Sequence, residues 1–281
     1  MPTKFSLYLN LMRAGSPTGY LLVFYPACYG LMLASPTISD LTKLLPFFFI
    51  GSFITRSAGC IINDIFDRDF DLHVIRTKNR PLANGEVSLK GAVILLLLLL
   101  VCSLVILLML NQAAIYLGCL AFIMILLYPL MKRFTNLPQL FLGLTFNFGS
   151  LISYAAVTGY ISIEAIIMYL ACCSWTVGYD TIYGFMDYED DKKIGIKSLS
   201  LLLEQRNYKL YFLVFYLGFV GLFILATILA NHYVNYLLIS FAAILLLWQI
   251  LTLKIANPQN CLIRFKNNNY VGLIFFLTIC G

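Results

Sequence analysis

Uninterrupted runs of about 20 apolar residues recur along the whole chain and dominate what it can fold into. A helix rises 1.5 Å per residue, so a run of about 20 residues crosses a hydrocarbon layer of ~30 Å. Hydrophobic residues make up 61% of the sequence and charged residues 11%, against about 45–50% and 25% in soluble domains. Because the runs are continuous rather than alternating, they indicate helices and not membrane strands. We therefore expect an all-α integral protein of the lipid bilayer.

The runs predict nine transmembrane helices in a single domain, residues 1–281. No linker rich in Pro, Gly or Ser divides the chain, and the two longest polar segments are residues 64–89 and 183–209. The last run is short for a complete crossing. The expected helices lie near residues 18–35, 43–63, 90–110, 113–131, 137–157, 162–182, 210–230, 233–254 and 270–281.

Basic residues predict the orientation of these helices. Of the 19 Lys and Arg residues, 17 lie in the N-terminal tail and after the second, fourth, sixth and eighth helices. Loops rich in Lys and Arg stay in the cytoplasm, so we expect the N-terminus and both long polar segments there. The net charge of +6 suits anionic lipid headgroups and is no sign of a nucleic-acid partner. The eight scattered cysteines lack metal-ligand spacing, and we interpret them as apolar packing residues.

Most of the acidic charge is concentrated in two short stretches. "NDIFDRDFD" (63–71) holds four acids and "DTIYGFMDYEDD" (180–191) holds five, which is nine of the 13 in the chain. Residues three or four apart share one face of a helix. If helices continue through both stretches, one face carries Asn63, Asp64, Asp67 and Asp71. In the second stretch the same spacing aligns Asp180, Tyr183, Asp187, Asp190 and Asp191.

Carboxylates this close together need a counter-charge. Two like charges about 6 Å apart repel by roughly 2–3 kcal/mol at an effective dielectric constant near 20. Carboxylates and an amide oxygen, without His or Cys, form a hard-oxygen site that suits Mg²⁺. We therefore predict metal ligands in the first cluster at Asn63, Asp64, Asp67 and Asp71, and in the second at Asp187, Asp190 and Asp191.

Basic residues follow both acidic clusters. Mg²⁺ typically bridges one or two carboxylates to a substrate phosphate, and phosphate oxygens also accept charge-assisted hydrogen bonds. The combination predicts a diphosphate-binding site. The candidate contacts are Arg76, Arg80, Lys132, Arg133 and Lys197.

Two other interpretations of the charges are open. Single charges in polar segments are commonly just solvated, but two clusters in helical register at helix ends favour a site. A transporter or channel would place its ionisable residues near the membrane midplane on broken helices. Here the acids lie at the ends of the apolar runs and are accompanied by cations, which favours an enzyme.

The sequence resembles the UbiA-type intramembrane aromatic prenyltransferases. "NDIFDRDFD" fits the NDxxDxxxD motif of that family, and "DYEDD" fits its DxxxD motif. "YPLMKRFTNLPQLFLGLTFNFG" and "GYDTIYGFMDYEDDKKIGIKSLS" are similar to the 4-hydroxybenzoate polyprenyltransferase branch in particular. "RAGSPTG" departs from many members, because it keeps Arg13 and Pro17 but lacks an Asp-Lys pair between them.

The resemblance implies nine helices around a central cavity, with both motifs facing each other in cap segments over its cytoplasmic mouth. It also implies a bacterial-type inner membrane and a role in ubiquinone biosynthesis. The implied reaction is Mg²⁺-dependent transfer of a polyprenyl chain from polyprenyl diphosphate to 4-hydroxybenzoate, at the carbon ortho to the hydroxyl, releasing diphosphate. A naphthoate, a haem vinyl group or a glycerol-phosphate lipid is the alternative acceptor within the same fold.

Roles for individual residues follow from this reaction. The catalytic candidates are Asp67, Asp71, Asp187 and Asp191 around the diphosphate, and Asp180, which would orient the phenol or accept its proton. Arg13 and Arg56 are alternatives for binding the benzoate carboxylate. An Arg inside a membrane helix costs about 3 kcal/mol and normally has a partner or a function, so the alternative role for Arg56 is to neutralise a nearby Asp. Tyr128 and Tyr183 are candidates for stabilising the allylic cation, because ring faces attract cations.

Overall fold

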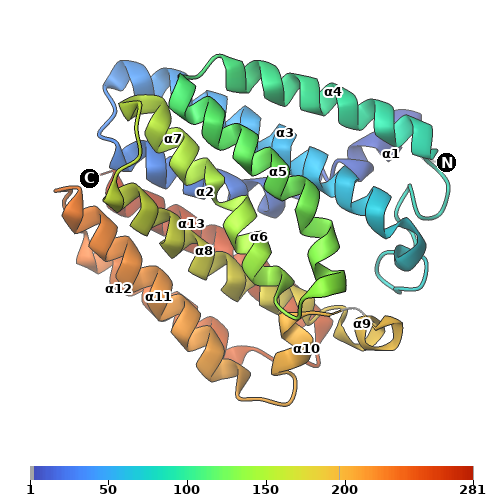
Figure 1. Ribbon diagram of the computed structural model, residues 1–281. Coiled ribbons are helices and arrows are strands. Elements are labelled where there is room, and N and C mark those ends of the chain that lie inside the picture. The colour runs from blue at the N-terminus through green and yellow to red at the C-terminus, as the bar shows by residue number, and fades with distance from the viewer. Residues whose placement is uncertain (1–2, 196, 281) are drawn as a thin grey trace.

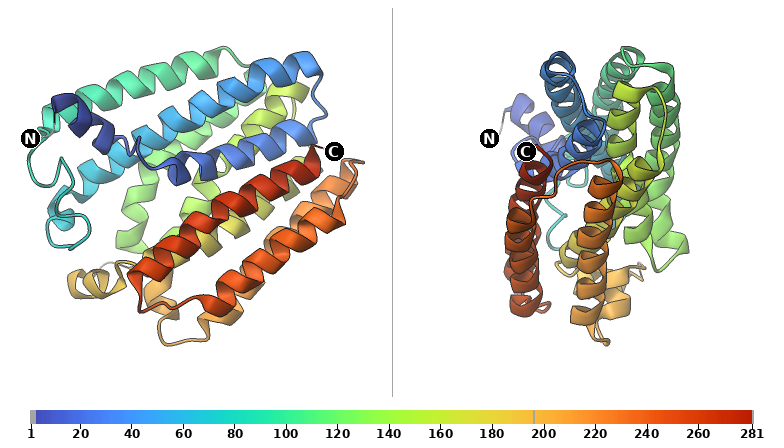
Figure 2. Two further views of the ribbon diagram at one scale, coloured as in Figure 1. Left: turned by 180° about the vertical axis from the view of Figure 1, so that it is seen from behind. Right: turned by 90° about the vertical axis from the view of Figure 1, so that its left-hand side faces the viewer.

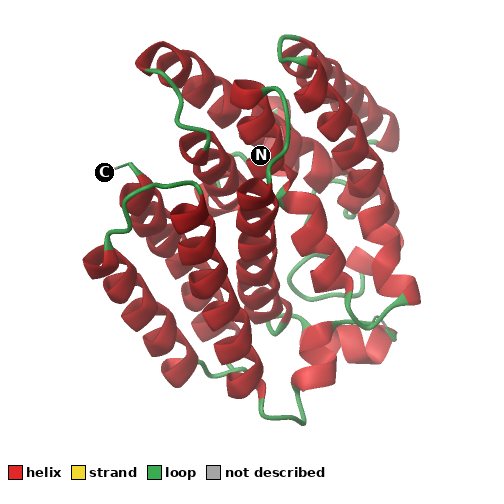
Figure 3. Ribbon diagram, turned by 60° about the vertical axis from the view of Figure 1, so that its left-hand side comes forward, coloured by secondary structure: helices red, strands yellow, loops and turns green. Residues whose placement is uncertain are grey.

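The computed structural model describes residues 3–195 and 197–280, apart from the side chains of Lys132 and Ile194. Figures 1 and 3 show that these residues form helices joined by loops, and none of them forms a strand. The helices are α1 (Lys4–Leu11), α2 (Pro17–Leu33), α3 (Ile38–Asp71), α4 (Leu89–Leu108), α5 (Gln112–Phe134), α6 (Pro138–Phe146), α7 (Phe148–Thr158), α8 (Ile163–Gly184), α9 (Tyr188–Ile194), α10 (Leu199–Leu203), α11 (Tyr208–Leu229), α12 (Tyr236–Thr252) and α13 (Pro258–Ile279).

The described residues contain six helical segments that are long and apolar enough to cross a membrane. These segments are α3, α4, α5, α8, α11 and the joined pair α6–α7, while α12 is apolar but shorter. The chain is therefore a multi-pass membrane protein, and the count of nine crossings stays a prediction.

The expectation of a short last helix at 270–281 is wrong. α13 begins at Pro258, because the polar residues before position 270 continue the helix instead of ending it.

α3 is the longest helix and positions the first acidic cluster. It begins with a capping box, in which the Thr37 hydroxyl accepts from the Asp40 N–H and the Asp40 carboxylate accepts from the Thr37 N–H. It then continues without a break to Asp71. The predicted extension past Asn63 is confirmed, so the predicted side chains project from consecutive turns of one helix.

The second acidic cluster is not on a single helix, which corrects the predicted alignment of Asp180 with Asp187 and Asp191. α8 ends at Gly184. After a turn a separate helix, α9, begins, and Asp187 is its N-cap residue. Asp180 thus belongs to a membrane helix, whereas Asp187 and Asp191 belong to a short helix beyond its end. An acid at a helix N-terminus is favoured by the helix dipole, and this preference is consistent with a new helix starting there.

Close helix packing holds the N-terminal half of the bundle together. A Cβ atom on Gly30 of α2 would lie 1.8 Å from the carbonyl oxygen of Ser150 on α7, so only glycine fits at this contact. α6 and α7 meet at Asn147, whose Nδ2 donates to the Gly143 carbonyl (2.6 Å) and to Thr176 Oγ1 of α8 (2.8 Å). The Asn147 amide therefore provides a hydrogen-bond donor to a backbone carbonyl next to the helix break, and it also links the break to α8.

Aromatic side chains form the centre of the C-terminal half. The Trp175 ring of α8 stacks on Phe219 of α11 at a centroid distance of 5.1 Å, and Phe219 contacts Phe275 of α13 at 4.4 Å. Trp175 Nε1 donates to Asn268 Oδ1 (2.8 Å). All four side chains are fully buried. This aromatic core joins α8, α11 and α13, and Figure 2 shows α13 lying between α2 and α12.

The two acidic clusters lie at the same end of the bundle. Figure 1 shows the N-terminus, the C-terminal end of α3 and the short helices α9 and α10 at this end, and the C-terminus at the opposite end. This arrangement agrees with the predicted common side for the N-terminus and both polar segments.

Candidate active site

One cavity of about 920 Å³ extends from the acidic end of the bundle into its interior. Both clusters line its acidic end, with Asp67 and Asp71 from the first and Asp187 and Asp191 from the second. Residues that follow the clusters in sequence line the same end. Its deeper part is lined mainly by apolar side chains of α3, α4 and α5, such as Phe48, Leu104 and Ile106. The cavity therefore offers a charged end and a long apolar end to one ligand.

The first cluster is buried beside two arginines. Asp64, Asp67 and Asp71 are 2%, 3% and 6% exposed. Arg13 Nη2 donates to both carboxylate oxygens of Asp64, at 2.8 and 2.7 Å. Arg80 Nη1 donates to Asp64 Oδ1 (3.0 Å) and to Asp71 Oδ2 (2.7 Å). Burial on this scale is tolerable only with such compensation.

The second cluster is joined to the loop that follows α3. Arg76 forms an ion pair with Asp187, in which its Nε donates to Oδ1 at 2.7 Å and its Nη2 donates to Oδ2. Its Nη1 donates to the Tyr183 hydroxyl (2.6 Å), and the guanidinium lies over the Tyr183 ring, 4.9 Å from its centroid. Burial lowers the pKa of Arg76, but Tyr183 and Asp187 outweigh that effect and raise it. Arg76 is therefore a permanent positive charge beside the second cluster, in the lining of the cavity.

The donor chemistry of the site fits Mg²⁺. The candidate ligands Asn63, Asp64, Asp67, Asp71, Asp187 and Asp191 all line the cavity and present only oxygen ligands, the type that Mg²⁺ prefers. Within the described residues no three His, Cys, Asp or Glu side chains are grouped as a metal site. Guanidinium groups neutralise Asp64, Asp71 and Asp187 instead.

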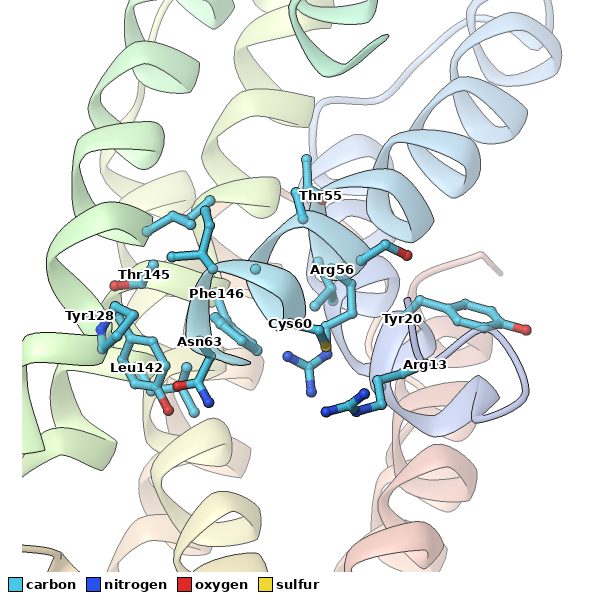
Figure 4. Close-up of a pocket in the computed structure, with 18 of the residues that line it drawn as sticks. Arg13, Tyr20, Thr55, Arg56, Cys60, Asn63, Tyr128, Leu142, Thr145 and Phe146 are labelled. Atoms are coloured by element: carbon cyan, nitrogen blue, oxygen red, sulfur yellow. The ribbon is translucent and has the colours of Figure 1, made fainter. Parts of the chain in front are cut away.

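Arg56 projects from α3 into the cavity near the boundary between its charged and apolar parts. Its guanidinium lies over the Phe146 ring, 5.3 Å from the centroid, and the described residues place no carboxylate within ion-pair distance of it. Figure 4 shows Arg56, Asn63, Tyr128 and Phe146 around the same space. Asp180 of α8 also lines the cavity. Arg56 is thus available to a ligand, whereas Arg13 is already held by Asp64.

The structure brings most of the predicted site residues together, but not all of them. Tyr183 and Lys197 line the cavity with the clusters. Arg133 is not among the lining residues. Its Nη2 donates to the Phe66 carbonyl (3.1 Å), and its guanidinium lies over the Phe70 ring. Asp190 is also absent from the lining, and the side chain of Lys132 lies outside the described part of the chain.

Sequence reasoning missed residues that shape the site through packing or backbone contacts. Phe146 lies beneath Arg56, and Thr77 Oγ1 donates to the Asp71 carbonyl (3.0 Å). Gln139 Oε1 accepts from the Leu199 N–H (2.9 Å), which holds the segment beside Lys197. A Phe in an apolar run has no distinguishing signal, and neither does a Thr in a loop. A glutamine near a membrane helix is the one signal that the sequence offered.

A helical membrane bundle whose apolar cavity ends in facing carboxylates and arginines has the architecture of an intramembrane prenyltransferase. Residues 23–279 match the UbiA prenyltransferase family. The chain belongs to this family.

Curated relatives and solved structures agree with this assignment. The chain is 39% identical over 278 residues to the 4-hydroxybenzoate octaprenyltransferase of Shewanella loihica, covering 98% of this chain and 96% of the relative. It is 38% identical over 270 residues to the enzyme of that name from Francisella tularensis subsp. novicida, covering 96% and 95%.

Among solved structures, a UbiA homolog from Aeropyrum pernix superposes with a TM-score of 0.78 at 26% identity, over 92% of this chain and 96% of the homolog. A UbiA homolog from Archaeoglobus fulgidus bound to GPP and Mg²⁺ shares the fold, with a TM-score of 0.68 at 17% identity over 98% of each chain.

Proposed function

We propose that this protein transfers a polyprenyl chain from polyprenyl diphosphate to the carbon of 4-hydroxybenzoate ortho to the hydroxyl, releasing diphosphate, in ubiquinone biosynthesis. The observation that carries the proposal is that two aspartate clusters from distant parts of the sequence line the charged end of one apolar cavity. The curated relatives that align over nearly the whole chain are named for this activity.

The diphosphate would bind at the charged end of the cavity. Asn63, Asp64, Asp67 and Asp71 would hold one Mg²⁺, and Asp187 with Asp191 a second. When bound, the metal stabilises negative charge on the leaving diphosphate. Arg76, Arg80 and Lys197 line the same end and would donate charge-assisted hydrogen bonds to the diphosphate oxygens.

The polyprenyl chain would occupy the apolar part of the cavity. Leu97, Val101 and Leu104 of α4 line this part, and each is more than half exposed in the described structure. Their apolar surface offers a long hydrocarbon chain favourable contacts. The same apolar walls keep water away from the allylic cation, which water would quench.

The aromatic acceptor would lie between these two regions. Arg56 would bind the carboxylate, with Phe146 beneath the guanidinium, because no described carboxylate already pairs with it. In the reaction the allylic C–O bond breaks and diphosphate leaves. A bond then forms between the allylic carbon and the ring carbon, and the ring loses a proton. Asp180 would orient the phenol hydroxyl or accept a proton, and Tyr128 and Tyr183 would face the cation.

The proposed placement is a bundle of nine crossings in a bacterial-type inner membrane, with the active site and N-terminus in the cytoplasm. The distribution of Lys and Arg supports the orientation. The N-terminus, the end of α3 and α9 lie at one end of the bundle, so the proposed orientation puts all three on the same side.

An assay in membranes with labelled 4-hydroxybenzoate and a polyprenyl diphosphate tests the proposal. We expect a prenylated hydroxybenzoate product that requires Mg²⁺ and disappears when the metal is chelated. A parallel reaction with a dihydroxynaphthoate acceptor tests the alternative within the same fold. Preferential prenylation of the naphthoate, or no product with either acceptor, would contradict the proposed function.

Replacing Arg56 with alanine should impair binding of the aromatic acid specifically. The benzoate loses its cation, so we expect the KM for 4-hydroxybenzoate to rise about tenfold or more, as for loss of a charged hydrogen bond. The KM for the diphosphate should change much less. Arg13→Ala is the matched comparison, because Arg13 is held by Asp64. A larger benzoate effect in Arg13→Ala than in Arg56→Ala would exchange the two assignments.

A further inference from the structure

Residues 75–80 connect the two acidic clusters, and we call them the bridging segment. The Ile75 N–H donates to Asp190 Oδ2 (3.1 Å), and Arg76 contacts Asp187 and Tyr183. At its other end, Arg80 pairs with Asp64 and Asp71 of the first cluster. Thr77 Oγ1 adds a hydrogen bond to the Asp71 carbonyl. The bridging segment is thus fixed to α9 at one end and to α3 at the other.

Asp190 differs from its neighbours in the second cluster. Asp187 and Asp191 line the cavity, whereas Asp190 does not. Its two oxygens face a backbone N–H and a lysine, since Oδ2 accepts from Ile75 and Oδ1 from Lys193 Nζ (3.5 Å). The Ile75 side chain itself is 72% exposed. Ile75 therefore contributes its backbone N–H rather than side-chain packing, and this hydrogen bond holds the segment to α9 next to the Arg76–Asp187 ion pair.

We propose that Asp190 is a positioning residue and not a metal ligand. By accepting the Ile75 N–H it fixes the backbone immediately before Arg76, and so places the Arg76 guanidinium against Asp187 and Tyr183 at the charged end of the cavity. This inference rests on the proposed function, in which Arg76 contacts the diphosphate. Asp190 acts on the reaction only through Arg76, so its loss affects diphosphate binding and leaves the affinity for Mg²⁺ unchanged.

Asparagine and alanine at position 190 separate the two roles. An asparagine oxygen still accepts the Ile75 N–H but is a much poorer metal ligand than a carboxylate, whereas alanine removes the acceptor. We expect Asp190→Asn to stay within about twofold of wild type. Asp190→Ala should raise the KM for polyprenyl diphosphate about tenfold, the order of effect for loss of a charge-assisted hydrogen bond. The Mg²⁺ concentration for half-maximal rate should be the same in all three proteins.

Two matched controls accompany this pair. Lys193→Ala removes the other partner of Asp190, and that lysine side chain is 71% exposed, so we expect wild-type kinetics. Asp187→Asn changes a carboxylate that lines the cavity, so we expect a large loss of rate. If Asp190→Asn resembles Asp187→Asn and needs more Mg²⁺, Asp190 is a metal ligand. If Asp190→Ala behaves as wild type, the positioning role is wrong.

Hydrogen exchange of the purified protein provides a readout that does not depend on activity. The Ile75 amide should exchange faster in Asp190→Ala than in wild type and Asp190→Asn, because only alanine removes its acceptor. Unchanged exchange would overturn the inference. Faster exchange in a protein whose wild-type form does not prenylate 4-hydroxybenzoate would support the contact while contradicting the proposed function. If Asp190→Ala does not accumulate, Ile75→Pro removes the donor instead and should raise the same KM.

Discussion

Asp67→Asn is expected to lower kcat for prenyl transfer by about 10²–10³-fold, the range found when one group that stabilises transition-state charge is removed. Asp67 lies on the cavity-facing side of α3 and is 3% exposed. The amide keeps the size of the side chain but removes the negative charge that a divalent cation requires. Initial rates at saturating substrates, normalised to the amount of protein in the membrane, measure the effect.

Asp69→Asn is the matched control for this prediction. It makes the same chemical change two residues away in the same cluster, but Asp69 is exposed and does not line the cavity. Its turnover should equal that of wild type. Equal rates for the two variants would remove Asp67 from the active site. Loss of membrane-inserted protein in Asp67→Asn alone would assign it a structural role instead.

Arg80→Ala is expected to have the largest effect on stability. The substitution removes the partner of Asp71 and one of the two partners of Asp64, and both carboxylates are almost completely buried. Removing one member of a buried ion pair costs about 3–5 kcal/mol, because the remaining charge is left without compensation. We expect a much lower temperature of thermal unfolding for the detergent-solubilised protein, together with loss of activity.

Lys78→Ala tests whether this effect is specific to the ion pairs. Lys78 is an exposed cation in the same segment and forms no ion pair in the described structure. Its loss should change the unfolding temperature little, as is usual for exposed charges. Adding Asp71→Asn to Arg80→Ala should recover part of the lost stability. A double variant that is no more stable than Arg80→Ala would contradict the ion-pair explanation.

The first acidic cluster was predictable because the sequence contains its geometry. Asn63, Asp64, Asp67 and Asp71 recur every three or four residues at the end of an apolar run, and a helix continuing through them places them together. The location of the membrane helices followed in the same way from run length. Local spacing is sufficient in both cases, and no knowledge of distant contacts is needed.

The rest of the site depends on contacts between distant segments, which spacing does not specify. The turn between Gly184 and Tyr188 separates Asp180 from Asp187, so equal spacing in sequence did not mean a common face. Asp190 has the residue type and spacing of its neighbours in sequence, and only its contact with the Ile75 N–H distinguishes it from them. The partner of Arg13 is likewise visible only in three dimensions, since Asp64 is 51 residues away.

The packed rings of Trp175, Phe219 and Phe275 are not among the residues that line the cavity. Most of the tightly packed interior therefore lies apart from the surfaces that a substrate touches. Substitutions in α4 and α5 that widen or narrow the apolar part of the cavity do not touch this aromatic core. Their effect on the free energy of unfolding is therefore expected to be small and independent of the core. Because the packing core and the cavity lining are made of different residues, an ancestral protein of this fold could accept substitutions in the lining one at a time. Such substitutions would change the isoprenoid length or the acceptor without unfolding the bundle.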